Sequence, residues 1–323
     1  MNELTETKRA FSRIGWALFT YGIVTSILQI FVSILWLVYT AGTSLEDAEW
    51  ATWLLTFAPM YLVAVPIALI IMRTVPAEPQ ESKKLGAKKF WTLMLICMPV
   101  MYAGNIIGTI LSLILSGGTA VNALVDLVSG NPVYTLLFAV IAAPILEEYI
   151  FRKQIIDRLG RYGEKTAILV SALTFGLFHM NLFQFFYAFG LGTIFAYVYT
   201  RTRSIRYPIF MHMIINFQGS IIAPWVLEQL DTAVLDQLME GNLDLNLLTN
   251  ALPGLLVYMV YSAVILLTVV AGFVLLLLDW KKRQITDPPQ KLTAKTVLCN
   301  GGMIAFGVFS LIMILYALLS GLI

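Results

Sequence analysis

The chain has 323 residues, of which 59% are hydrophobic and only 12% are charged. Its mean hydropathy of +0.82 lies far above that of a soluble domain, so composition excludes a soluble enzyme and predicts a membrane protein. The formal net charge of +2 gives no sign of a nucleic-acid partner. The two cysteines, Cys97 and Cys299, lie in separate apolar segments, which argues against a disulfide framework.

Apolar stretches bounded by charged or turn-forming residues recur along the whole chain. Most have the ~20 residues that an α-helix needs to cross ~30 Å of hydrocarbon. They are 15–40, 50–72, 91–116, 132–151, 166–180, 182–199, 207–227, 253–279 and 296–322. The sequence therefore predicts an all-α, polytopic membrane protein with about nine transmembrane helices.

The basic residues test this map independently, because Lys and Arg gather on the cytoplasmic side of membrane proteins. In a nine-span arrangement all 21 basic residues fall on one side. The connections of the other side, 41–49, 118–131 and 228–252, hold nine acidic residues and no Lys or Arg. We therefore expect the N-terminus to be cytoplasmic and the C-terminus to lie outside.

Four parts are expected along the chain. They are two accessory transmembrane helices in 1–75, a central helical core in 90–227, an outer amphipathic segment in 228–252 and two C-terminal transmembrane helices in 253–323. The core is the part that carries ionisable side chains inside apolar segments.

Two adjacent carboxylates, Glu147 and Glu148, followed by Arg152, stand at the end of the apolar run 132–151. An ionisable group in a bilayer costs roughly 2.5–3.5 kcal/mol on insertion scales, so it is a functional hypothesis by default. Glu148 precedes Arg152 by four residues, the favourable orientation for an ion pair on a helix. Adjacent side chains diverge by about 100°, which leaves Glu147 free to face a different site. The alternative is that all three residues form a packing salt bridge.

His179 and Glu147 are expected at the same depth in the membrane. Both lie 16 residues from Gly163, which marks the turn between their two helices. Phe175 shares a helix face with His179, one turn earlier. The alternative for His179 is a hydrogen bond to a backbone carbonyl or to interfacial water.

His212 and Asn216 lie four residues apart and so share one helix face. They could face the same cavity as Glu147, or could hold two helices together through a polar contact. The expected depths of the two histidines in the membrane differ. His212 is about 9 Å from Arg206 along its helix, whereas His179 is about 24 Å from Gly163. The two histidines meet only if the hairpin that carries His179 protrudes into the cytosol or if the 201–206 loop dips into a wet cavity.

These residues form three motifs: Glu147-Glu148-x-x-x-Arg152, Phe175-x-x-x-His179 and His212-x-x-x-Asn216. Together and in this order they resemble the motifs of the CPBP family, which comprises CAAX prenyl endopeptidases and the bacterial Abi proteases. The resemblance covers about residues 90–225. Each motif is weak alone, but the ordered trio in a polytopic chain is a specific signal.

The resemblance implies an intramembrane endopeptidase. The residues that it implies at the centre are Glu147, His179, His212 and Asn216, with Glu148, Arg152 and Phe175 in support. In one version of the mechanism the first two hold and deprotonate the attacking water, and the next two stabilise the oxyanion. In the other, Glu147, His179 and His212 ligate a divalent metal such as Zn²⁺. We favour the metal-free version, because Glu148, paired with Arg152, is a poor base.

The implied substrate is a membrane-associated peptide or protein, and the expected location is the cytoplasmic membrane of a bacterium. Two other classes fit the same residues. One is a non-catalytic bacteriocin-immunity or scaffold protein that keeps the motifs as structure. The other is a proton-coupled transporter whose relay would also use Glu and His, although no inverted repeat typical of transporters is visible.

Overall fold

The structure is a computed structural model that describes residues 3–78, 80–231, 234, 245–279 and 292–319. Within these residues every regular element is a helix, which confirms the prediction of an all-α protein. Helices long and apolar enough to cross a membrane cover 3–40, 49–72, 87–115, 132–162, 182–202, 206–228, 249–278 and 301–319. The expected span 166–180 is a shorter helix of 15 residues, so the count of nine stays a prediction.

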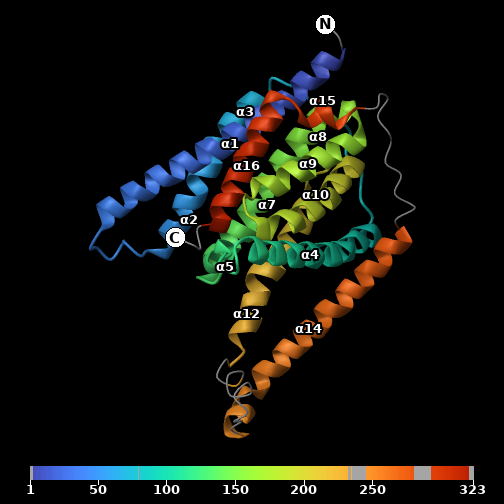
Figure 1. Cartoon of the computed structure of the whole chain (residues 1–323). Helices are drawn as coiled ribbons and strands as arrows, with labels where there is room; N and C mark the ends of the chain where they lie inside the picture. The colour runs from blue at the N-terminus through green and yellow to red at the C-terminus, as the bar shows by residue number, and fades with distance from the viewer. Residues whose placement is uncertain (1–2, 79, 232–233, 235–244, 280–291, 320–323) are drawn as a thin grey trace.

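The helices follow one another in the order shown in Figure 1. The N-terminal third consists of α1 (Glu3–Thr40), α2 (Glu49–Ala58), the π-helix η1 (Pro59–Ala64), α3 (Val65–Met72), α4 (Ala87–Leu115) and α5 (Ala123–Val128). The next stretch is one continuous helical rod made of α6 (Pro132–Tyr134), the π-helix η2 (Thr135–Ala142), α7 (Ala143–Glu148), the π-helix η3 (Tyr149–Gln154), α8 (Ile155–Leu159) and the 3₁₀-helix η4 (Gly160–Tyr162).

The remaining elements complete the central bundle and the C-terminal part. They are α9 (Glu164–Phe178), α10 (Leu182–Thr202), α11 (Arg206–Phe217), the π-helix η5 (Gln218–Ile222), α12 (Ala223–Glu228), α14 (Leu245–Asp279), α15 (Ala294–Leu298) and α16 (Gly301–Leu319). Of the predicted outer segment 228–252, residues 232–233 and 235–244 lie outside the described residues, and 245–252 belong to α14.

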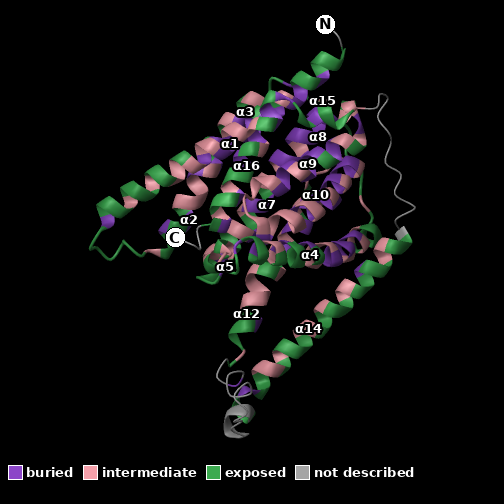
Figure 2. Cartoon of the chain, in the orientation of Figure 1, coloured by how far each residue is buried: buried purple, intermediate pink, exposed green. Residues whose placement is uncertain are grey.

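One hydrophobic core joins the first helices to the centre of the molecule. Ile14 of α1 and Met72 of α3 are fully buried in the same cluster as Phe151, Ala167 and Phe306. Figure 2 shows that buried residues are concentrated around α7, α8, α9 and α10. The helices of residues 1–75 therefore pack directly against the elements that carry the ionisable motifs.

Small residues set the spacing between α4 and α10, which form one wall of the bundle. A Cβ atom at Gly104 would collide with the backbone of Tyr187, and one at Gly108 with the carbonyl oxygen of Leu182. Such small-xxx-small pairs allow membrane helices to approach closely. Figure 1 shows α14 standing apart from the bundle along much of its length, with its C-terminal part crossing α4.

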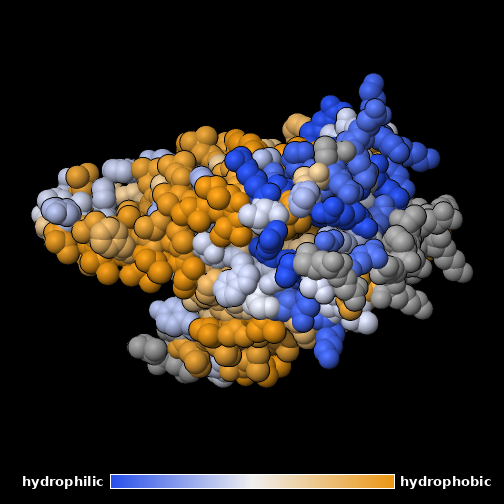
Figure 3. Space-filling model, turned by 90° about the horizontal axis from the view of Figure 1, so that it is seen from above, coloured by the Kyte–Doolittle hydropathy of each residue, from blue (hydrophilic) through white to orange (hydrophobic). Residues whose placement is uncertain are grey.

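The nine-span arrangement predicts five cytoplasmic segments, which are 1–14, 73–90, 152–165, 200–206 and 280–295. The first four lie together at one end of the molecule. The contacts that join them are Arg13 to the carbonyl oxygen of Thr74, Arg161 to Glu78, Arg201 to Glu164 and Arg203 to Asp157. Figure 3 shows hydrophilic side chains gathered at this end and hydrophobic side chains over the rest of the visible face. Most of the fifth segment, residues 280–291 with Lys281, Lys282 and Arg283, lies outside the described residues. This grouping is what the predicted topology requires, and the sidedness stays a prediction.

Candidate active site

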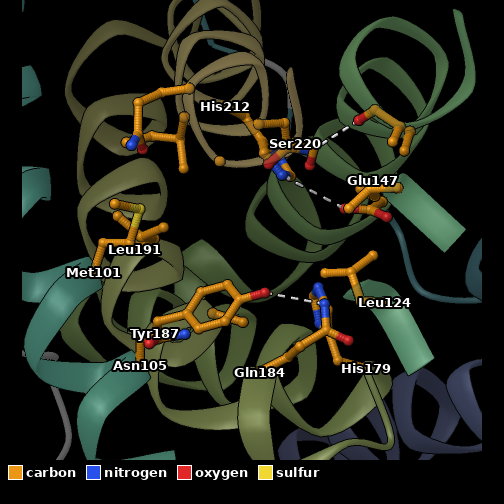
Figure 4. A pocket seen from close by; sticks show the side chains of 18 of the residues that line it. Met101, Asn105, Leu124, Glu147, His179, Gln184, Tyr187, Leu191, His212 and Ser220 are labelled. Carbon is orange, nitrogen blue, oxygen red and sulfur yellow. Dashed lines mark hydrogen bonds and ion pairs between the residues drawn. The ribbon is translucent and has the colours of Figure 1, made fainter. Parts of the chain in front are cut away.

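A cavity of about 420 Å³ lies among η1, α4, α5, α7, α10, α11 and η5. Its lining is mostly apolar, but it includes Glu147, His179, His212 and Asn216, together with Phe175. Figure 4 shows His212 and Glu147 on one side of this space and Tyr187 facing them from the other. The structure thus brings together all four side chains that the three motifs place at the centre.

Glu148 and Arg152 form the ion pair that their spacing predicts. Arg152 Nε lies 2.9 Å from Glu148 Oε2 and its Nη2 donates to Oε1 at 3.1 Å. Both side chains are fully buried. The guanidinium also lies over the ring of Phe175, 4.3 Å from its centroid, which is cation–π geometry. The charges are therefore balanced within the protein and away from lipid.

His212 is held by Glu148. Its Nδ1 lies 3.0 Å from Glu148 Oε1, and a carboxylate paired with arginine can only accept, so Nδ1 is the donor. The other ring nitrogen, Nε2, faces Glu147, 3.8 Å from its Oε2. Only Nε2 of His212 is thus available to a molecule in the cavity. Sequence reasoning paired Glu148 with Arg152 alone and missed this second role.

The tautomer of His179 is also fixed by the fold. Its Nδ1 lies 2.9 Å from the carbonyl oxygen of Phe175, which can only accept, so Nδ1 carries a hydrogen. In the neutral ring the lone pair is therefore on Nε2. The Phe175 ring stands edge-on to both imidazoles, with centroids 4.8 Å from His179 and 5.8 Å from His212. Phe175 thereby limits how far either ring can rotate.

A proline fixes the position of Asn216. In η2 the amide of Ala143 donates to the carbonyl oxygen of Phe138, and the next amide in line, that of Pro144, has no hydrogen. The carbonyl oxygen of Ala139 is therefore left without its helical donor, and Asn216 Nδ2 donates to it at 2.9 Å. One N–H of the amide is used in this bond, and the second is free for a ligand.

The expected mismatch in depth disappears because the helical rod extends beyond the predicted end at residue 151. Arg203 Nη1 lies 3.6 Å from Asp157 Oδ1, which also accepts a hydrogen bond from Tyr199 at 2.8 Å. Asp157 is ten residues beyond Glu147, and Arg203 is nine residues before His212. The Asp157–Arg203 contact therefore brings Glu147 and His212 to the same level.

Tyr61 belongs to this site and was missed by the sequence reasoning. Its hydroxyl lies 3.5 Å from Glu147 Oε1, at the outer limit of a hydrogen bond, and it comes from η1 in the supposedly accessory helices. The chain has 14 tyrosines, most of them in apolar segments, and nothing in the sequence around Tyr61 distinguishes it.

Three of the central residues, Glu147, His179 and His212, have donor atoms of the kinds that ligate Zn²⁺. Among the described residues, no three His, Cys, Asp or Glu side chains converge closely enough to hold a metal ion. Nδ1 of His212 is bonded to Glu148 and Nδ1 of His179 to the carbonyl oxygen of Phe175, which leaves Nε2 of each ring free. It is therefore the spacing of the side chains, and not the other bonds of the two rings, that does not fit a metal. No step of the proposed mechanism uses a metal.

Comparison with known proteins agrees with the three motifs. The family model described as "Type II CAAX prenyl endopeptidase Rce1-like" matches residues 129–218, the segment that contains every motif residue. The chain belongs to the CPBP family. Two curated relatives of this CPBP protein are the "Putative membrane peptidase YdiL" of Bacillus subtilis (strain 168), 30% identical over 166 residues, and the "Membrane-embedded CAAX protease MroQ" of Staphylococcus aureus (strain USA300), 29% identical over 170 residues.

Each alignment covers 48% of this CPBP chain, and 66% and 67% of the two relatives, about two thirds of their length. No solved structure matches the chain significantly. The family model and the relatives support the family membership. The structure supports the all-α fold and the apolar helices that the sequence predicts.

Proposed function

We propose that this CPBP protein is an intramembrane endopeptidase that hydrolyses a peptide bond of a membrane-associated peptide or protein. The observation that carries the proposal is the convergence of Glu147, His179, His212 and Asn216 on one cavity, with the two neighbouring carboxylates in different environments. The family match and the two relatives named as membrane proteases support the same reaction class.

In the proposed mechanism a water molecule is held between Glu147 and the Nε2 lone pair of His179. Glu147 takes a proton from this water, because it faces the cavity and has no arginine partner as Glu148 does. The resulting hydroxide attacks the carbonyl carbon of the scissile peptide bond. The proton is then returned to the departing amine nitrogen, so that one water is consumed and one acid and one amine are formed.

The tetrahedral oxyanion is stabilised by His212 and Asn216. When both ring nitrogens of His212 carry protons, Nε2–H is a donor at the level of Glu147. Asn216 offers the N–H that Ala139 does not use. Donors fixed in advance by other bonds require no reorganisation during the reaction, which makes such arrangements effective catalysts.

A proton-coupled transporter is less well supported by the geometry. A relay must continue across the membrane, whereas the charged chain Glu147–His212–Glu148 ends at Arg152. The Arg152 side chain is fully buried between Phe175 and Phe195. Beyond the ion pair, Arg152 Nη1 donates to the hydroxyl of Ser171 at 3.5 Å, and Ser171 donates to the carbonyl oxygen of Phe151. The hydrogen bonds described from Arg152 thus end on the backbone and not on another ionisable group.

The test is cleavage in a defined system. The protein is purified, reconstituted in vesicles with a panel of single-span and lipid-anchored peptide reporters, and incubated in ¹⁸O-labelled water. Hydrolysis predicts new termini with one ¹⁸O atom in the new carboxyl group, detected by mass spectrometry. A protein that binds reporters but yields no new terminus would instead support the immunity or scaffold alternative.

A further inference from the structure

The cavity continues past Asn216 to a set of hydrogen-bonding groups that the proposed mechanism does not use. Gln218, Gly219 and Ser220 of η5 line it one turn beyond Asn216. Figure 4 shows Ser220 on the same side of the cavity as His212, opposite Gln184 and Asn105. We propose that this segment binds the unwound main chain of the substrate next to the scissile bond. The inference rests on the proposed peptidase function.

The helix geometry at this segment exposes a backbone acceptor. The amide of Ala223 donates five residues back to the carbonyl oxygen of Gln218, and the next amide, that of Pro224, has no hydrogen. The carbonyl oxygen of Gly219 therefore has neither an i+4 nor an i+5 donor. The same arrangement in η2 frees the carbonyl oxygen of Ala139, and there a side chain fills the vacant position.

Gln218 provides a second acceptor without a partner. Its Nε2 donates to the hydroxyl groups of Tyr102 at 3.2 Å and Tyr261 at 2.7 Å, which fixes the side chain where α4, η5 and α14 meet. Its Oε1 is buried and has no hydrogen-bond partner in the described part of the chain. An unsatisfied buried acceptor costs about 1–3 kcal/mol, so an N–H donor that gains access to it on substrate binding would be favoured.

Ser220 adds a hydroxyl group that also has no hydrogen-bond partner within the described residues. Serine in a membrane helix usually bonds to the carbonyl four residues back, as Thr193 and Thr200 do here. Ser220 makes no such bond within the described structure, and its side chain lines the cavity. Two acceptors and one hydroxyl thus lie within three consecutive residues.

A substrate in this cavity needs such groups for a physical reason. A peptide bond within a helix is inaccessible to a water nucleophile, so the segment around it must unwind. Unwinding exposes N–H groups, and in hydrocarbon each unsatisfied one costs several kcal/mol. Acceptors on the enzyme remove this cost. The segment Gln218–Ser220 would therefore recognise main-chain amides and tolerate different side chains.

The experiment uses binding in the Glu147→Gln variant, so that turnover is not required. The probe is an acetylated, C-terminally amidated octapeptide of alternating Leu and Ala, labelled with a dye, and its analogue N-methylated at alternate residues. Affinity is measured in detergent by fluorescence anisotropy, with empty micelles as the blank. N-methylation removes amide hydrogens, and we expect it to weaken binding at least about tenfold, because each lost hydrogen bond costs about fivefold.

In the same background, Ser220→Ala and Gln218→Met are each expected to weaken binding of the unmethylated peptide about fivefold. Ser220→Thr keeps the hydroxyl and should bind this peptide with the affinity of the Glu147→Gln parent. Ser129→Ala, which removes an exposed hydroxyl from the turn after α5, is the matched control and should change affinity less than twofold. The double variant Gln218→Met/Ser220→Ala should lose most of its discrimination against the N-methylated peptide.

Equal affinity for the two peptides, an unchanged affinity in the variants, or no saturable binding of the unmethylated peptide would each overturn the inference. The outcome is separate from that of the proposed function. Specific binding without cleavage by the wild-type protein would contradict the peptidase proposal alone, whereas cleavage that is indifferent to Gln218 and Ser220 would contradict this inference alone.

Discussion

The imidazole of His212 donates from Nδ1 to Oε1 of Glu148 at 3.0 Å. Glu148 is fully buried and is also ion-paired with Arg152, whereas the adjacent Glu147 faces the cavity with its side chain 15% exposed. The neighbouring carboxylates of Glu147 and Glu148 therefore have different roles. Glu148 orients a histidine and balances a charge, and Glu147 is left with free acceptor capacity beside the histidine that Glu148 orients.

Replacement of Glu148 should mainly affect stability. Glu148→Gln leaves Arg152 buried without its counter-charge, which typically costs 3–5 kcal/mol. We expect a clearly lowered unfolding temperature in detergent and a loss of cleavage. A double variant, Glu148→Leu with Arg152→Met, removes both charges and should be more stable than Glu148→Gln. If it is less stable, the ion pair is not what the single variant disrupts.

The amide of Asn216 should be irreplaceable by a carboxylate. Asn216→Asp removes the donor to Ala139 and places an acceptor against an acceptor, so we expect a loss of about 1–3 kcal/mol in the free energy of unfolding. The catalytic rate constant should fall because the oxyanion loses a donor. Chemical unfolding and cleavage kinetics are measured on the same preparations. Unchanged stability would show that the Ala139 bond contributes little.

Tyr61→Phe tests whether the first helices contribute to the site. Removing the hydroxyl takes away a long hydrogen bond to Glu147, and we expect a decrease of a few-fold in the rate constant, in line with about 1 kcal/mol for one such bond. The Michaelis constant and the unfolding temperature should not change. Tyr39→Phe, on an exposed tyrosine of α1, is the control.

The sidedness of the protein can be tested by cysteine labelling. In a variant with Cys97 and Cys299 replaced by alanine, single cysteines at positions 84 and 206, which are both exposed, should react with an impermeant maleimide only after the cells are opened. A cysteine at position 47 should react in intact cells. Labelling of position 206 from outside would contradict the predicted topology and the placement of the basic end.

Local patterns in the sequence predicted the parts of the site that depend on one helix or on two helices joined by a short turn. The Glu148–Arg152 pair follows from four-residue spacing, and the equal level of Glu147 and His179 follows from their equal distances to one turn. These relationships hold because helix geometry is regular over a few turns.

The contacts between distant helices could not be predicted in this way. The hydrogen bond from His212 to Glu148 requires the register that Asp157 and Arg203 set between two helices, and periodicity says nothing about register between segments 64 residues apart. The π-helical stretches before Pro144 and Pro224 were also not predicted. A proline inside an apolar run predicts a kink, but it does not tell which carbonyl oxygen loses its helical hydrogen-bond donor.

The most direct test of the account is the cleavage rate of the Glu147→Gln variant in reconstituted vesicles, compared with Glu81→Gln as an exposed control. The mechanism makes Glu147 the proton acceptor, so we predict a rate at least about 10²-fold below that of the wild type, an unfolding temperature close to that of the wild type, and no change in the control. A Glu147→Gln protein that still cleaves the reporter at the wild-type rate would contradict the central claim.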